Sequence, residues 1–559
     1  MSYLLKSKTL KPLVFIFVGL LFGLSTMASC HKKTESKTNI LPDSTIYSKQ
    51  NFTNRVIDSS SIVAFFKINP ASDSVKKDVY QFYMRRAYQF AWFNQNGMTC
   101  AIANFYNQIQ NYTRDFADNS FQNTRLVTLF AAAERDEKEF LMQDKYVQEF
   151  ELLLTSTYFK YAKVAYGGIA KNTFDLEWFI PRKKKNYQIL LDSLVSSVEC
   201  KNLQEPVNQY YIKLKEKLGQ YRKLQDKGGF PTIKTTKKLL VLGDKDSCLL
   251  QTKRYLLLTG DLKINDNSDL FTDSLALAVK RFQQRMGLAT TGKIDHATIT
   301  EFNKPIDFRI KQMMVNMERL RWIPLELEND YLLVNIPEFR LHIFENGKLA
   351  WATNVVVGKN VHQTSIFRGN LSQIVLNPYW GVPMSIARNE ILPKLKRNPA
   401  YLKNNNIEVF SGNTPINPYS INWQNYGKNL PYTFRQKPGN NNALGKIKFL
   451  FPNNYHIYLH DTPSKSLFAE SKRAFSLGCI RVENPKKLAL YLLRTNTNWS
   501  AEKVDNILAT NTETTIRISP TVPVYIAYFT AWVDSNGQLN FRNDLYNLDN
   551  KLAKEIFGE

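Results

Sequence analysis

The pattern of apolar and polar residues along the chain changes twice. Over residues 51–235, apolar side chains recur at every third or fourth position, as in DVYQFYMRRAYQFAWF (78–93) and NQYYIKLKEKLGQYRKLQ (208–225). That period predicts amphipathic helices. The run GGFP (228–231) breaks the pattern and marks the end of this region. From about residue 331, apolar and polar residues alternate, which predicts strands.

A compact three-helix unit is predicted between these two regions, over residues 236–305. Its first helix is expected in SCLLQTKRYLLLTG, after Gly243-Asp244, and its second over 273–288. A third is expected in HATITEFN, after a turn at 291–295. We interpret residues 306–330 as a helix that links this unit to the strands.

Residues 331–535 are predicted to form a mainly-β domain, and 536–559 a C-terminal tail. The alternating runs are YLLVNI (331–336), FRLHIF (339–344), LAWATNVVVG (349–358), LSQIVLN (371–377), KIKFLF (446–451), YHIYLH (455–460), TTIRIS (514–519) and VPVYIAYFTAWV (522–533). An insertion over 388–442 separates the strands. Its length predicts a lid over a site, with a solvated excursion as the alternative. The pattern as a whole predicts a multidomain α+β fold with a helical N-terminal scaffold.

The N-terminus resembles an export signal. Lysines 6, 8 and 11 precede an apolar stretch over 13–24, and small residues then lead to Cys30. This order predicts a signal peptide over 1–30. A cysteine in that place resembles a bacterial lipobox, so we expect lipidated Cys30 to anchor the protein to a membrane; an uncleaved signal-anchor is the alternative. The polar stretch 31–50 would be a tether. The expected location is the periplasm, and His31 favours the inner face of the outer membrane.

Composition narrows the class of partner. The chain has 559 residues and a formal net charge of +25, which indicates an anionic partner. An exported protein does not meet nucleic acid, so nucleic acid is excluded as that anionic partner. The five cysteines lie far apart and form no C-x-x-C pair, which argues against a zinc site and against a disulfide scaffold. We therefore expect most of them to be buried thiols.

The residues that carry chemistry are concentrated in 455–485. His460 ends a predicted strand, and Cys479 follows within SLGCIR (476–481). A free thiol has a pKa of about 8.5 and needs a base such as imidazole to become a nucleophile. This pairing predicts Cys479 as the nucleophile and His460 as its base.

The flanking residues fit the same chemistry. Gly478 allows a close backbone approach to a substrate, and the N–H groups near it and Cys479 could hold an oxyanion. Arg481 could bind a carboxylate or order the loop. Ser476 begins the same box, and Tyr458 shares the strand face of His460. The other histidines of the strand region, His342, His362 and His456, are interpreted as structural.

The segment resembles the active-site signature of the L,D-transpeptidase (YkuD-like) family, a His followed by (S/T)-x-G-C-x-(R/N). HDTP (460–463) is similar to the large branch of that family, as are the following: Thr364, NPYW (377–380), Val382-Pro383, Pro393, QKPG (436–439), ALGKIKF (443–449), PVY (523–525) and TAW (530–532). Leu477 departs from the small or His residue usual at its place. The unit 236–305 resembles a peptidoglycan-binding domain, and the likeness extends over about 50–550.

The resemblance implies an enzyme that acts on peptidoglycan stem peptides. Cys479 would attack a donor stem, D-Ala would leave, and a second stem's amine would resolve the acyl-enzyme into a 3→3 crosslink, with His460 as base and then acid. No metal or organic cofactor is implied, and carbapenems would acylate Cys479. Two alternatives stay open: an L,D-carboxypeptidase or other hydrolase of the same fold, and a catalytically idle peptidoglycan-binding protein.

Overall fold

The computed structural model describes residues 46, 48, 51–169, 172–182, 185–197 and 205–558, which all belong to one compact unit, Asp43–Glu559. The expected signal peptide, Cys30 and most of the expected tether lie outside the described residues. Within the described ranges, no helix has both the length and the apolar character needed to cross a bilayer.

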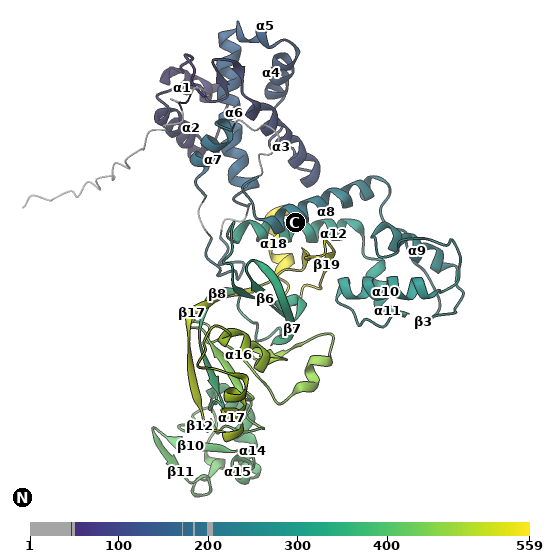
Figure 1. Cartoon of the computed structure of the whole chain (residues 1–559), viewed down its shortest axis with the longest axis vertical. Helices are drawn as coiled ribbons and strands as arrows, with labels where there is room; N and C mark the ends of the chain where they lie inside the picture. The colour runs from purple at the N-terminus through teal and green to yellow at the C-terminus, as the bar shows by residue number, and fades with distance from the viewer. Residues whose placement is uncertain are drawn as a thin grey trace, which may run out of the picture. The chain divides into compact units, whose positions relative to one another are not determined.

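The N-terminal region is helical, as predicted (purple to blue in Figure 1). Its helices are α1 (Ser59–Ile68), α2 (Asp73–Arg85), α3 (Cys100–Phe116), α4 (Thr124–Arg135), α5 (Glu137–Leu141), α6 (Asp144–Ala165) and α7 (Tyr187–Val195), with a short hairpin of β1 (Phe93–Asn94) and β2 (Gly97–Met98). Asp136 ends α4 and caps α5, because its side chain accepts a hydrogen bond from Glu139 N–H. Cys100 is disulfide-bonded, which corrects the expectation that it is a free buried thiol.

The predicted three-helix unit is confirmed. It contains α9 (Cys248–Leu258), α10 (Asp273–Met286) and α11 (His296–Phe302), together with the short strands β3 (Leu239–Leu240) and β4 (Ile294–Asp295). Gly287 closes α10 in the left-handed conformation, with φ of +70°, as a C-terminal glycine does.

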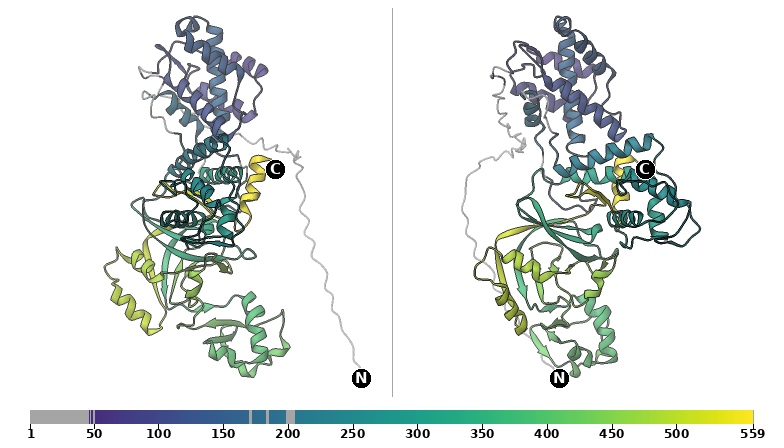
Figure 2. Two further views of the ribbon diagram at one scale, coloured as in Figure 1. Left: turned by 90° about the vertical axis from the view of Figure 1, so that its right-hand side faces the viewer. Right: turned by 45° about the vertical axis from the view of Figure 1, so that its right-hand side comes forward.

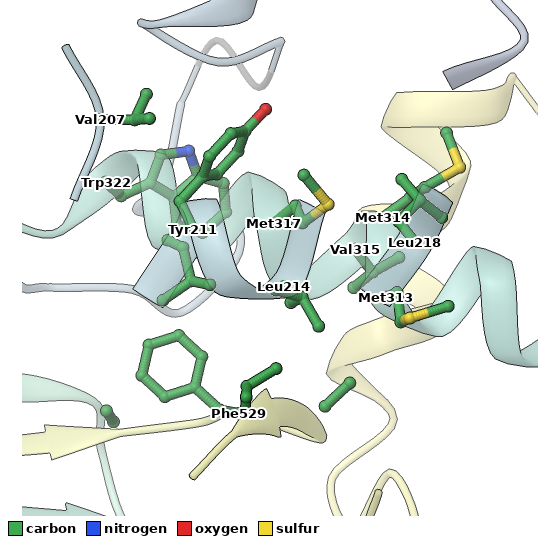
Figure 3. Packing of buried hydrophobic residues seen from close by; sticks show 14 of the residues in the cluster. Val207, Tyr211, Leu214, Leu218, Met313, Met314, Val315, Met317, Trp322 and Phe529 are labelled. Carbon is green, nitrogen blue, oxygen red and sulfur yellow. The ribbon is translucent and has the colours of Figure 1, made fainter. Parts of the chain in front are cut away.

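Helix α12 (Ile306–Trp322), expected as a linker, is almost wholly buried. One face packs on α8 (Gln209–Asp226), where Tyr211, Leu214 and Leu218 meet methionines of α12, with Phe529 below (Figure 3). At its C-terminal end, Glu318 accepts hydrogen bonds from the backbone N–H of Ile169 (2.8 Å) and the indole of Trp322 (3.1 Å). Helix α12 therefore contacts both the N-terminal region, at Ile169, and the C-terminal segment that contains Phe529.

Replacing Glu318 by alanine is expected to lower the free energy of unfolding by about 3–5 kcal/mol, because its ion pair with Arg321 (2.7 Å) is buried and the arginine would be left unpaired. Chemical denaturation measures this. Asp144→Ala is the control, since its pair with Arg55 is exposed and should contribute less than about 1 kcal/mol. Equal effects of the two substitutions would contradict the expectation.

The strand region forms a nine-stranded sheet in the order β15-β7-β16-β14-β13-β8-β17-β5-β6, and a further pairing of β6 with β7 closes it on itself. The strands are β5 (Tyr331–Asn335), β6 (Arg340–Glu345), β7 (Lys348–Gly358), β8 (Phe367–Leu376), β13 (Ile447–Leu450), β14 (Leu459–His460), β15 (Ala474–Ser476), β16 (Ile480–Val482) and β17 (Thr514–Ala527). Helices α16 (Pro485–Leu493) and α17 (Ala501–Thr510) follow β16. The predicted α+β fold is thus confirmed.

The insertion is a small folded subdomain (green in Figure 2). Its four-stranded sheet has the order β11-β10-β12-β9, and a core separate from the main one includes Leu392, Leu402, Trp423 and Phe434. Its elements are β9 (Trp380–Gly381), α13 (Met384–Ile386), α14 (Leu392–Arg397), α15 (Ala400–Asn404), β10 (Ile407–Ser411), β11 (Thr414–Ile416) and β12 (Thr433–Gln436).

The C-terminal residues pack on the rest of the fold. Strands β18 (Ala531–Val533) and β19 (Leu539–Phe541) pair, and α18 (Leu548–Phe557) follows. Asp549 of α18 forms a buried ion pair with Arg319 of α12 (2.5 Å). The expected tail, 536–559, therefore holds a strand and a helix with tertiary contacts.

Candidate functional site

Strand pairing brings the predicted catalytic residues to one face of the sheet. Strands β14 and β16 run parallel with Leu459 opposite Ile480 and His460 opposite Arg481. Continued by one residue, that register places Tyr458 beside Cys479. Because alternate residues of a strand share a face, these four polar side chains lie together. The rings of Tyr458 and His460 are 5.6 Å apart, which agrees with that arrangement.

The tautomer of His460 follows from its hydrogen bond. Its Nδ1 lies 2.5 Å from the backbone oxygen of Asp461, and a carbonyl oxygen can only accept. Nδ1 therefore carries the proton, which leaves Nε2 unprotonated and able to act as a base. Burial lowers the pKa of His460 to about 3, and the positive charge of Arg481 contributes, so the ring is neutral near pH 7.

Asp461 is fixed in turn. Its carboxylate accepts hydrogen bonds from the backbone N–H of Thr462 (2.7 Å) and from Nζ of Lys465 (2.6 Å). Gly445, with φ of +63°, passes so close to the Asp461 side chain that any Cβ there would collide with it. These contacts orient the carbonyl group that holds the imidazole.

The Cys479 thiol is half-buried and donates to the backbone oxygen of His456 at 3.6 Å. No hydrogen bond joins it to His460 in the described part of the chain, although both residues line one cavity. Burial raises the pKa of the Cys479 thiol, while the backbone N–H of Tyr458 and the nearby cations act in the opposite direction. The resting pair is thus a neutral thiol and a neutral imidazole.

The loop before Cys479 corrects part of the predicted oxyanion site. The backbone N–H of Gly478 donates to Oγ of Ser476 (3.1 Å), and that Oγ donates to the backbone oxygen of Cys479 (2.6 Å). The Gly478 N–H is therefore occupied, and the N–H of Cys479 remains for an oxyanion. Gly478 has φ of +119°, a conformation that requires glycine.

Thr364 and Tyr546, both distant in sequence, hold the loop before Cys479 in place through hydrogen bonds. Oγ1 of Thr364 donates to the backbone oxygen of Gly478 (2.7 Å), and Thr364 N–H donates to the hydroxyl of Tyr546 (3.2 Å). That hydroxyl donates to the backbone oxygen of Gly358 (2.6 Å). The C-terminal segment thus reaches the residue beside Cys479 through Thr364.

Thr364→Val is expected to lower turnover by about 10–100-fold while the protein stays folded, because valine keeps the shape but cannot orient the Gly478 carbonyl. Steady-state kinetics on the proposed substrate, with a melting curve, measure both. Thr364→Ser, which keeps the hydroxyl, is the matched control. Equal turnover in the valine and serine variants would contradict this role.

Cys479 and His460 line a cavity of about 790 Å³. Its sheet side also contains Lys448, Tyr458 and Arg481. A further part of its lining comes from the segment that leads into the insertion and from its first residues: Trp380, Gly381, Pro383, Ser385, Ile386, Asn389 and Glu390. The insertion therefore forms part of the cavity wall.

Two cavity residues were missed or misread from the sequence. Lys448 lies opposite His460 on β13, and a lysine inside a predicted central strand next to the histidine strand was the available signal. His456, interpreted as structural within a strand, lies outside β14 and has φ of +55°. Its carbonyl group is the acceptor for the Cys479 thiol.

Family comparisons match three separate parts of the chain. Residues 329–518 match the family described as "L,D-transpeptidase catalytic domain", 77–218 the "Scaffold domain", and 250–301 the "Putative peptidoglycan binding domain". The first range contains the whole sheet face described above.

The chain is similar to a curated protein of Haemophilus influenzae named "Putative L,D-transpeptidase", with 36% identity over 244 residues. These residues cover 43% of this chain and 49% of the relative, so the chain spans about half the length of the curated relative. Similar solved structures include L,D-transpeptidases from Xylanimonas cellulosilytica (13% identity, TM-score 0.17, 53% of this chain and 100% of that chain) and Stackebrandtia nassauensis (12%, 0.21, 54% and 97%). Both structures share little sequence identity with this chain and superpose on it poorly.

Proposed function

We propose that this chain, whose residues 329–518 match the L,D-transpeptidase catalytic domain family, forms 3→3 crosslinks between peptidoglycan stem peptides through an acyl-enzyme on Cys479. The observation that carries the proposal is the sheet face on which Cys479 and a His460 with unprotonated Nε2 line one cavity. The match of residues 250–301 to a peptidoglycan-binding family supports the substrate class.

The proposed reaction has two halves. The Cys479 thiol gives its proton to Nε2 of His460, and Sγ attacks the donor carbonyl carbon, whose oxyanion the Cys479 N–H stabilises. The C–N bond then breaks, and the leaving D-Ala amine takes the proton from His460. In the second half, the acceptor amine loses a proton to His460 and attacks the thioester, which returns the thiol.

The nucleophile that resolves the acyl-enzyme distinguishes crosslinking from hydrolysis. If water replaces the amine, the same acyl-enzyme gives an L,D-carboxypeptidase, while an idle binding protein would form no acyl-enzyme. Incubation with purified muropeptides, followed by mass spectrometry, separates the three. Crosslinked dimers support the proposal, trimmed monomers support the hydrolase, and unchanged muropeptides reject both enzymes.

We further propose that lipidated Cys30 tethers the enzyme to a membrane, with the inner face of the outer membrane favoured. The order of basic, apolar and small residues before Cys30 supports this. Cys30→Ser should abolish lipidation. If that variant still partitions wholly with membranes, an uncleaved signal-anchor is the better account.

The insertion is proposed to close over the bound peptide. Replacing residues 388–442 by a short glycine-serine bridge is expected to lower kcat/KM for peptide stems by about 10–100-fold, because Asn389 and Glu390 leave the cavity lining, β9 loses its partner β12, and water enters. Steady-state kinetics provide the measurement. Alkylation of Cys479 by iodoacetamide should persist as the control, since that reagent needs no wall. Unchanged kcat/KM with natural stems would reject the lid.

A further inference from the structure

Three titratable side chains lie side by side across three neighbouring strands at the site. Lys448 of β13 lies opposite His460 of β14, and Arg481 of β16 lies opposite His460 on the other side. Residues directly opposite on paired strands point to the same face, so the two cations flank the imidazole. Both also line the cavity that contains Cys479.

Neither cation is paired with a carboxylate within the described residues. Lys448 is half-buried, and its Nζ lies over the ring of Tyr458, 4.1 Å from the centroid. The Nε of Arg481 is buried with no hydrogen-bond partner. Burial lowers the pKa of both groups, so holding them charged in this position has a cost.

The acidic side chains near the site do not neutralise Lys448 and Arg481 through an ion pair. The carboxylate of Asp461 is bonded to Thr462 N–H and Lys465, and that of Glu513 accepts from the backbone N–H of Tyr379 (2.7 Å). Among the described residues that line the cavity, only Glu390 is acidic, and it belongs to the insertion. Buried polar groups without partners often mark a place where a ligand binds.

We propose that Lys448 is a specificity-determining residue that binds a carboxylate of the substrate beside the carbonyl that Cys479 attacks. The identity of that substrate, a wall stem peptide, rests on the proposed function. Tyr458 lies between the two groups, since its ring is under Nζ of Lys448 and its side chain contacts the Cys479 thiol. A carboxylate on Nζ would therefore sit about one aromatic ring from the nucleophile. Because ammonium is a point charge, Lys448 would select for charge, with Arg481 available as a second donor.

The test measures binding in the Cys479→Ala background, so that it does not depend on turnover. The probes are two tetrapeptide stems, one with a free carboxylate at the second centre of its diaminopimelate and one with that carboxylate amidated. Calorimetry should show that the Cys479→Ala protein prefers the free carboxylate by about tenfold or more. Adding Lys448→Met should bring the ratio close to one, while Lys448→Arg should retain part of it.

Lys446→Met is the matched control, because its Nζ bonds to Asn511 (2.6 Å), and the ratio should not change. The proposal is overturned if Lys448→Met keeps the parent ratio, if it weakens both peptides equally, or if neither peptide binds the parent. A failure of the proposed function would show differently: the wild-type protein would give no crosslinked product even though the binding ratio still depended on Lys448.

Discussion

Cys479→Ala is expected to lower peptide turnover by on the order of 10⁴-fold or more and to fold as the wild type does. Without the sulfur there is no acyl-enzyme. The fold should survive because the side chain is only half-buried and its thiol makes a weak hydrogen bond to the His456 carbonyl at 3.6 Å. Kinetics with muropeptides and a melting curve together test this expectation.

Intact-mass measurement tests the assignment of Cys479 as the nucleophile without a natural substrate. A carbapenem-type β-lactam should add one adduct per chain to the wild type and none to Cys479→Ala. Cys248→Ala is the matched control, because burial raises the pKa of that thiol to about 12 and it should not react. An adduct that persisted in Cys479→Ala would remove Cys479 as the nucleophile.

The periodic parts of the fold were predictable from the sequence. Long amphipathic stretches gave the N-terminal helices, and alternation gave strands such as β7 and β8. The role of α12 was not predictable, because a helix buried on nearly all sides has no polar face to reveal its packing. The strand and helix within the C-terminal tail from residue 536 were not predicted, since the ten-residue helix depends on partners such as Arg319, more than two hundred residues away in sequence.

Some residues of the candidate site were likewise predictable from the sequence, and others were not. Cys479 and His460 could be singled out as candidates from the sequence because their flanking residues form a local signature. Tyr546 could not, because it reaches the site only through a hydrogen bond across the fold, and Lys448 gave no more signal than a lysine inside a predicted central strand. The orientation of the Gly478 N–H was equally hidden, since it depends on the rotamer of Ser476. Chemistry carried by a local motif is visible in one sequence, whereas support from distant elements is not.

His460→Gln should lower turnover by about 10²–10⁴-fold, because glutamine can still donate to the Asp461 carbonyl but cannot accept the thiol proton. It should also remove an acid sensitivity of the fold. In the folded protein the pKa of His460 is about 3, below its ordinary value of about 6.5. Between these values the unfolded chain binds a proton that the folded chain does not, so the free energy of unfolding falls as pH falls.

The contribution of neutral His460 is fully present above about pH 6.5 and is lost at up to about 1.4 kcal/mol per pH unit below it. Between pH 7.5 and pH 5, the wild type should therefore lose about 2 kcal/mol more than His460→Gln in urea unfolding. Other titrating groups are common to both proteins and cancel in this difference. His296→Gln, at an exposed histidine, should behave as the wild type does. Parallel pH dependence in the wild type and His460→Gln would mean that His460 is not held neutral by burial, and the base assigned to Cys479 would have to be reconsidered.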